Sequence, residues 1–275
     1  MSIRQSQHDS PSTVGYRRWQ RALRSLLSVC LIIEAGLAAA NAPVNGRAQD
    51  LAFNSDEVQA MAASAYHQSL LELTRRGALD HNPELLARVR RIAQPIFAQA
   101  VLLKPEAAQW NWEIHIAKAN QIDAYCMAGG KILVGAGFLE KQALTDGEIA
   151  ALLAHEIAHA IAEHVREELS MVRRLSPDYA YFSLEEVIGL LGWDLSVSLR
   201  LAPLSRLQEL EADDIGITLA AKAGFDPHAL VLFYRKLGRD GSSADLIDTH
   251  GSNVDRLRAV ENFAVYAEKL YGTSR

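Results

Sequence analysis

His155, Glu156 and His159 form an HExxH sequence, in which two histidines lie four residues apart. On an α-helix this spacing puts both imidazoles on one face, where they can bind the same metal ion. Zinc suits two histidine nitrogens, and a glutamate beside the first histidine can take a proton from a water molecule at the metal. The apolar run 149–154 places this helix in the core, where imidazoles without partners are costly. The pattern therefore predicts a zinc site with Glu156 as general base.

A catalytic zinc site needs a third protein ligand and one open position. Glu209 is the candidate, and Asp213 follows it at the spacing that shares one helical face. Glu209 can bind the metal while Asp213 accepts a hydrogen bond from a ligand histidine and fixes its tautomer. Glu211 lies about 200° around the helix from Glu209, so we expect it to point elsewhere.

Two predicted helices carry these residues. Thr145 and Glu148 form a capping box, which predicts a helix that runs through the HExxH sequence to about Leu169. Ser205 and Gln208 form a second box, which predicts a helix from there to about residue 222.

The remaining elements frame these helices. Alternating apolar residues over 112–116 predict one strand, and Lys131–Val134 predicts another after a Gly129-Gly130 turn. Capping and proline signals predict further helices over 54–76, from residue 83, and from residue 252 onward. We therefore expect one α+β domain over 50–275, mostly helical, with a small antiparallel sheet beside the HExxH helix.

Segment 176–204 is harder to interpret. Its residues 187–191 favour a helix, whereas Leu195–Leu199 alternates like a strand. A covering loop or buried helix, a mobile lid, and a contact with a membrane surface or envelope complex are the alternatives.

Composition excludes several classes of protein. The chain has 275 residues, a formal net charge of −5 and two cysteines. Nucleic-acid binders are usually basic, so no nucleic-acid partner is expected. Two cysteines cannot build a disulfide scaffold or a cysteine-rich zinc module. Neither the oligomeric state nor the physiological substrate follows from the sequence.

Residues 1–42 have a different character from the rest. Five arginines occur in the first 24 residues, an apolar stretch covers 26–40, and small residues end at Ala42. This order is typical of a secretory signal, and an uncleaved N-terminal anchor or a mitochondrial presequence are the alternatives. Cleavage near Ala42 would leave Cys126 as the one remaining cysteine. No other stretch is long and apolar enough to span a membrane.

Four blocks in order resemble the M48 family of zinc metallopeptidases, HExxH gluzincins, in its Oma1-like or exported bacterial branch. The blocks are Asp123–Ile132 with its glycine pair, His155–His159 with His164 downstream, Ser205–Asp213, and Thr249-His250-Gly251 followed by Arg256. The resemblance covers about residues 55–270. Asp123 stands where the family usually has Asn, and Gly251 where it has Pro.

The resemblance implies one Zn²⁺ per chain, bound by His155, His159 and Glu209. It implies Glu156 as general base and Asp213 as the partner of a ligand histidine. His250 would bind the tetrahedral oxyanion or cap the open position of the metal. Arg206 and Arg256 are expected to be ion-pair anchors, with stabilisation of the oxyanion as the alternative, and His164 is expected to be structural.

The expected activity is that of a zinc endopeptidase acting on unfolded or misassembled proteins in quality control of the cell envelope. We expect an extended peptide to pair with an exposed strand near Lys131–Val134, where the Gly129-Gly130 turn lets the backbone approach closely. The expected substrate-binding residues are Gly129, Gly130, Lys131 and Ile132. An export signal places the protein in a bacterial periplasm, and a mitochondrial location is the alternative. The competing function is a chaperone-like factor that binds clients and has weak or latent protease activity.

Overall fold

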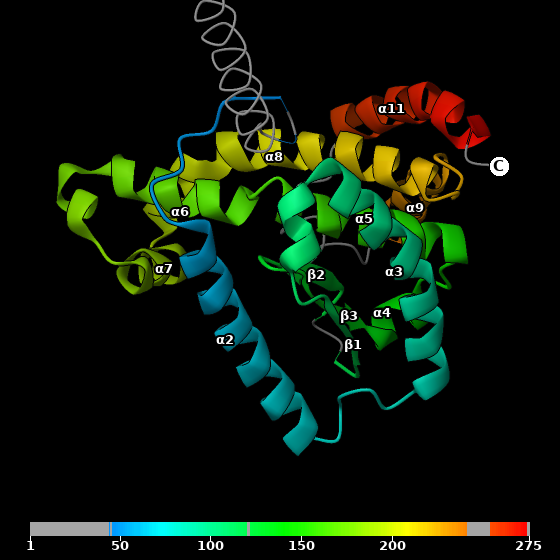
Figure 1. The fold of residues 1–275 in the computed structure, drawn as a ribbon, viewed down its shortest axis with the longest axis horizontal. Coiled ribbons are helices and arrows are strands. Elements are labelled where there is room, and N and C mark those ends of the chain that lie inside the picture. Colours follow the sequence, from blue (N-terminus) through cyan, green and yellow to red (C-terminus); the bar gives the residue numbers. More distant parts are fainter. Residues whose placement is uncertain (1–43, 45, 120–121, 241–253, 274–275) are drawn as a thin grey trace, which may run out of the picture. The chain divides into compact units, whose positions relative to one another are not determined.

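The computed structural model describes residues 44, 46–119, 122–240 and 254–273 (Figure 1). These residues belong to one unit, Pro43–Arg275. The predictions for the leader 1–42 and for the Thr249-His250-Gly251 block lie outside the described residues.

Helices dominate the described chain, and a small sheet lies between them in sequence, so the predicted mostly helical α+β class is confirmed. The elements are α2 Ser55–Arg75, α3 Pro83–Leu103, η1 Pro105–Gln109, β1 Glu113–Ala117, β2 Ala124–Met127, β3 Lys131–Gly135, α4 Ala136–Lys141, α5 Asp146–Ile161, α6 His164–Leu175, η2 Pro177–Tyr181, α7 Leu184–Trp193, α8 Leu195–Lys222, α9 Ala229–Asp240 and α11 Val254–Thr273.

Side-chain caps start the helices where the sequence predicts them. The Asn54 side chain accepts a hydrogen bond from Asp56 N at the start of α2, and the Asn82 side chain accepts one from Leu85 N in α3. Thr145 caps α5 with the complete capping box. Each cap satisfies a backbone N–H that has no partner within its own helix.

The sheet is mixed, with strand order β1-β3-β2, so the prediction of a wholly antiparallel sheet is wrong. β3 pairs parallel with β1 and antiparallel with β2. Every residue of β3 is buried, which is typical of a central strand. The segment Ala78–Asp80 covers the C-terminal end of the outer edge of β1. Leu79 forms a bridge with Ala117, and backbone hydrogen bonds join Asp80 to Ile116 and Lys118 to Ala78.

Helix α5 lies at the centre of the main core. It packs against α3, α8, α9 and strand β2 (Figure 1). Its residues from Glu148 through Ala158 are all buried. The two predicted ligand histidines therefore project from a helix that is fixed on several sides.

Two helix boundaries differ from the prediction. Helix α5 ends at Ile161 rather than near Leu169, because Glu163 takes a left-handed conformation (φ 57°) before α6 begins. The Glu163 carboxylate is held there by Ser55 Oγ at 2.9 Å and Arg166 Nη1 at 3.0 Å. These bonds stabilise a backbone conformation that is uncommon for a residue other than glycine.

Helix α8 begins at Leu195, so the predicted strand over Leu195–Leu199 and the predicted start at Ser205 are both wrong. Asp194 caps this helix. Ser205 lies inside it and donates a hydrogen bond to Glu168 instead of capping. Pro203 is tolerated within α8 because it lies on the exposed side, where water can satisfy the freed carbonyl.

Segment 176–204 is mainly covering structure. Leu184 and Val187 of α7 and Val197 and Leu201 of α8 are buried in a second apolar cluster with α6. Among the described residues no single helix is long and apolar enough to cross a membrane. The stretches Leu184–Leu191 and Ser196–Lys222 reach that length and composition only as a pair, bent by 92°.

Candidate metal centre

Three side chains converge at the contact between α5 and α8. His155 and His159 project from α5, and Glu209 projects from α8. The Nε2 atoms of the two histidines are 3.1 Å apart. Glu209 oxygens lie 3.5 Å from His155 Nε2 and 3.4 Å from His159 Nε2. Ligands around a tetrahedral zinc ion are separated by about 3.3 Å, so these three donors fit one face of such a site.

A glycine lets the two helices approach this closely. A Cβ at Gly216 of α8 would lie 2.9 Å from the backbone N of His155 and 3.0 Å from its Cα. Any larger residue there would push the helices apart. Gly216 therefore helps to bring Glu209 within reach of the histidines.

Asp213 supports His155 from behind. Its Oδ1 atom is 3.0 Å from His155 Nδ1, which leaves Nε2 directed toward the other donors. Arg256 Nε donates to Asp213 Oδ2 at 2.6 Å, and Tyr234 Oη donates to Oδ1 at 2.7 Å. Asp213 is completely buried. The carboxylate thus fixes both the tautomer and the orientation of His155.

Arg256 of α11 joins the two carboxylates of α8. Its Nη1 atom lies 2.8 Å from Glu209 Oε2, while its Nε and Nη2 atoms bind Asp213. The side chain is 4% exposed. These contacts agree with the predicted role of an ion-pair anchor, whereas Arg206 lies on the exposed side of α8.

The electrostatics of the site favour positive charge at His155. Burial lowers the pKa of this histidine, but its bonds to Asp213 and Glu209 outweigh burial and raise the pKa to about 10. Burial likewise raises the pKa of Asp213, and the contacts with His155 and Arg256 bring it below its usual value. A site built in this way holds either a proton or a metal cation at the histidine.

His159 has a different partner behind it. Its Nδ1 atom is 3.0 Å from Nδ1 of His164, which is buried at the start of α6. If Nε2 of His159 binds a metal, Nδ1 carries the proton and donates to His164. His164, which we expected to be structural, therefore contacts a predicted ligand directly.

Comparison with known proteins identifies the family. The sequence model described as "Peptidase family M48" matches residues 81–264. The chain belongs to peptidase family M48. Membership confirms the resemblance to the M48 family that the sequence motifs indicate, and it confirms the predicted enzyme class, a hydrolase of peptide bonds.

Individual relatives agree with this assignment. The chain is 31% identical to "Mitochondrial metalloendopeptidase OMA1" of Schizosaccharomyces pombe over 84% of this chain and 68% of that protein. It is 26% identical to "Metalloendopeptidase OMA1, mitochondrial" of Homo sapiens over 83% of this chain and 46% of that protein. It is 26% identical to "Metalloprotease LoiP" of Escherichia coli over 55% of this chain and 62% of that protein. The chain thus spans from under half to about two thirds of the length of these relatives.

The structure places the M48 general-base candidate toward strand β2. Glu156 is buried in α5. Helix α5 packs against β2, which carries Cys126. Burial raises the pKa of the Cys126 thiol, and the charge of Glu156 raises it further. Cys126 is a free, buried cysteine.

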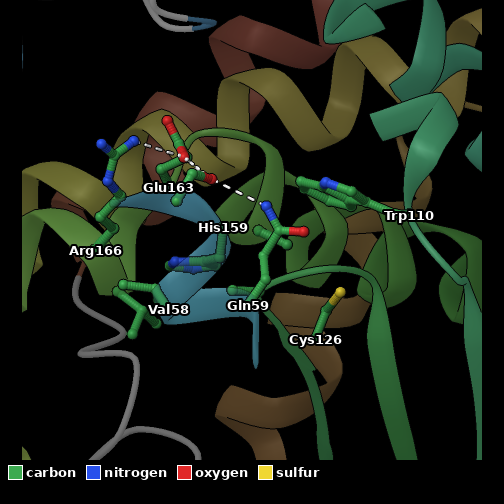
Figure 2. A pocket seen from close by; sticks show the side chains of 11 residues that line it. Val58, Gln59, Trp110, Cys126, His159, Glu163 and Arg166 are labelled. Carbon is green, nitrogen blue, oxygen red and sulfur yellow. Dashed lines mark hydrogen bonds and ion pairs between the residues drawn. The ribbon is translucent and has the colours of Figure 1, made fainter. Parts of the chain in front are cut away.

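A narrow pocket opens beside His159. Figure 2 shows the side chains that line it, among them His159, Gln59 of α2, Cys126 of β2, Trp110 and Arg166. Its volume is about 10 Å³, which is room for a single water molecule.

The structure contradicts the exposed strand expected near Lys131–Val134, while substrate binding by Gly129, Gly130, Lys131 and Ile132 stays a prediction. Lys131 and Ile132 are buried in β3, which pairs on both sides and offers no open edge to a peptide. Lys131 Nζ donates to Glu113 Oε1 at 2.6 Å. Gly130 has φ 75°, and a Cβ there would lie 2.7 Å from the Trp112 ring. These residues shape the sheet, and β2 is the edge strand beside α5.

Some contacts had no signal in the sequence. Tyr234 lies in α9, 21 residues from Asp213, within no motif. The sequence marks His164 only by its position after the HExxH sequence. His250 lies outside the described residues, so its predicted role stays a prediction.

Proposed function

We propose that this M48 protein is a zinc-dependent endopeptidase that cleaves unfolded or misassembled proteins. The observation that carries the proposal is the convergence of His155, His159 and Glu209, whose donor atoms have the separations of a tetrahedral zinc site. Two nitrogens and one carboxylate oxygen form a typical donor set for catalytic zinc. The names of the relatives, which describe metalloendopeptidases, support the same activity.

Zinc bound by these residues would polarise the scissile carbonyl and lower the pKa of a water molecule. Glu156 would accept a proton from the attacking water as its oxygen bonds to the carbonyl carbon. Glu156 would then deliver that proton to the amine nitrogen as the peptide C–N bond breaks. Asp213 would hold His155 in the binding tautomer throughout.

We place the peptide along β2, in correction of the expected pairing with β3. Among the described strands, β3 is central and Ala78–Asp80 covers the C-terminal end of the outer edge of β1. β2 packs against α5, and its Cys126 lines the pocket beside His159. Backbone hydrogen bonds to β2 would bring an extended chain past Glu156.

The decisive experiment compares the wild type with Glu156→Gln. We expect one zinc ion per chain in both proteins, and cleavage of unfolded casein only by the wild type, because glutamine cannot accept the proton. Glu140→Gln makes the same chemical change at an exposed position of α4 and should leave cleavage intact. Equal cleavage by Glu156→Gln would remove Glu156 from the mechanism. Zinc binding without cleavage by the wild type would favour the chaperone-like alternative.

We also propose that residues 1–42 are an export signal or N-terminal anchor, and that the protein works in a bacterial envelope. The similarity to LoiP of Escherichia coli supports a bacterial location, and the similarity to mitochondrial proteins supports the alternative, a mitochondrial location. N-terminal sequencing of protein from the periplasmic fraction tests the proposal. A contact of 176–204 with membrane or envelope partners stays a prediction, with Tyr181 and Leu199 as its exposed apolar side chains.

A further inference from the structure

The segment 46–54, which we call the N-terminal strap, runs along α6 before α2 begins. Several bonds attach it there. They are Gln49 Nε2 to Ala162 O (2.9 Å), Ala52 N to Ser170 Oγ (2.9 Å), Arg166 Nε to Phe53 O (2.6 Å) and Arg174 Nη1 to Asp50 O (2.9 Å). Phe53 is buried in the second apolar cluster. The strap is thus part of the folded domain.

Arg47 of the strap binds two carboxylates at once. Its Nε atom donates to Glu211 Oε1 at 2.6 Å and its Nη2 atom to Glu211 Oε2 at 3.0 Å. Its Nη1 atom donates to Glu167 Oε1 at 2.5 Å, and Nη2 also donates to Oε2 at 2.8 Å. Such bidentate hydrogen bonds fix the plane of a carboxylate as well as its position.

Glu211 in turn leads to the metal centre. Its Oε2 atom is 3.3 Å from Nε2 of His164, and Nδ1 of His164 is 3.0 Å from Nδ1 of His159. The protons fit one arrangement. A metal at His159 Nε2 leaves a proton on Nδ1, which His164 Nδ1 accepts. His164 then carries its own proton on Nε2, the nitrogen that lies 3.3 Å from the Glu211 carboxylate.

We propose that Arg47 is a positioning residue of the metal centre, acting on His159 through Glu211 and His164. By holding the Glu211 carboxylate, Arg47 keeps His164 in the one tautomer that accepts a hydrogen bond from His159. Glu211 points away from the ligands, as its place on the helix predicts, yet it is connected to them through His164. This inference rests on the proposed metal binding by His155, His159 and Glu209.

The test measures metal affinity in the full-length protein by competition with a chromophoric chelator. Arg47→Ala should weaken zinc binding by roughly 3- to 10-fold. Loss of a residue that hydrogen-bonds a metal ligand directly costs about 10- to 100-fold in affinity, and Arg47 acts through two intervening residues. Arg47→Lys keeps one charged donor and should restore part of the loss. Arg174→Ala is the matched control. Arg174 binds the strap at Asp50, and among the described residues its contacts do not include Glu211.

Cobalt substitution provides a second readout. The visible absorption of bound Co²⁺ reports ligand geometry, so Arg47→Ala should shift its bands while Arg174→Ala leaves them in place. Thermal melts of the metal-free proteins check that each variant is folded. An unchanged affinity and spectrum in Arg47→Ala, or an equal loss in Arg174→Ala, would overturn the proposal.

A double variant tests the route. In His164→Asn, the amide oxygen can still accept from His159, but the link to Glu211 is cut. Adding Arg47→Ala to His164→Asn should then change zinc affinity by less than about twofold, because nothing remains to transmit its loss. A full additional loss would show that Arg47 acts by another path.

The outcomes also separate this inference from the proposed function. A wild type that binds no zinc would overturn both. A wild type that binds zinc but cleaves nothing would contradict the endopeptidase proposal, while the affinities of Arg47→Ala and Arg174→Ala would still decide the role of Arg47.

Discussion

The two histidines of the metal centre are supported in different ways. His155 is backed by Asp213, which is fully buried and bound by Arg256 and Tyr234 inside the core. His159 is backed by His164, whose contacts lead outward to Glu211 and to Arg47, a side chain that is 27% exposed. We call Asp213, Arg256 and Tyr234 the inner support, which joins α5, α8, α9 and α11. We call His164, Glu211, Arg47 and Glu167 the outer support, which joins α5, α6 and α8 to the N-terminal strap.

The difference separates two tasks. Buried charge must be compensated for the chain to fold at all, so the inner support contributes to the stability of the protein with or without metal. The outer support lies partly in solvent, where an ion pair adds little to stability. We therefore expect inner substitutions to affect folding strongly, and outer substitutions to affect mainly the metal.

The largest effect is expected for Asp213→Asn. Asparagine keeps the size of the side chain but removes the charge that faces Arg256 and His155. Breaking a buried ion pair costs about 3–5 kcal/mol, and the remaining contact of Arg256 with Glu209 puts this case at the lower end. Urea unfolding of the metal-free protein measures the loss.

Asp214→Asn is the control for Asp213→Asn. It makes the same change one residue further along α8 at an exposed position, and it should alter the free energy of unfolding by less than about 0.5 kcal/mol. Similar losses in both variants would contradict the distinct role of the inner support.

Gly216→Ala should have the next largest effect. Its new methyl group would lie 2.9 Å from His155 N, so α5 and α8 must separate at the inner support. Overpacking of this kind costs about 1–3 kcal/mol, and zinc affinity should fall with it because Glu209 moves away. Both quantities are measured, by urea unfolding and by chelator competition.

Gly189→Ala is the matched glycine substitution. Gly189 lies in α7, where a Cβ meets nothing within 4 Å. Alanine there should stabilise the helix by about 0.4–1 kcal/mol and leave zinc affinity unchanged. A loss of affinity in Gly189→Ala but not in Gly216→Ala would refute the role of the close helix contact.

Local signals in the sequence predict much of this site. HExxH spacing, the Thr145 capping box and the four-residue step from Glu209 to Asp213 each depend on helix geometry alone. These signals place the side chains on the correct faces of α5 and α8. The structure then brings Glu209 to the histidines at the separations expected of ligands.

Other features depend on contacts between distant residues and could not be predicted in this way. The capping pattern at Ser205 is used inside a longer helix, because the apolar positions Val197 and Leu201 extend α8 into the second cluster. The sheet order depends on which strand the core buries on both sides, and the short strands alone do not reveal it. Arg47 and Glu211 are 164 residues apart, with no local pattern joining them.

The smallest predicted effect concerns pH at the outer support. Burial raises the pKa of Glu167, but hydrogen bonds from Arg47, Gln208 and Gln49 outweigh it and bring the pKa below its usual value. Glu211 faces the same arginine from α8. A carboxyl group with a lowered pKa in the folded state adds stability above its unfolded pKa, and this contribution is lost as the pH falls through the folded value.

Glu167→Gln measures that contribution, because glutamine resembles the protonated acid. At pH 6 the wild type should exceed the variant in free energy of unfolding by about 1 kcal/mol or less, since Arg47 is partly exposed. The difference should shrink as the pH falls below the unfolded glutamate pKa of about 4.3 and through the lower folded value, because the wild-type carboxyl group then becomes neutral too. Both proteins are unfolded with urea in the presence of EDTA, so that protonation of metal-bound ligands does not contribute. A difference that stays constant from pH 6 to pH 3 would mean that the charge of Glu167 does not stabilise the strap, and Arg47 would then be held mainly by Glu211.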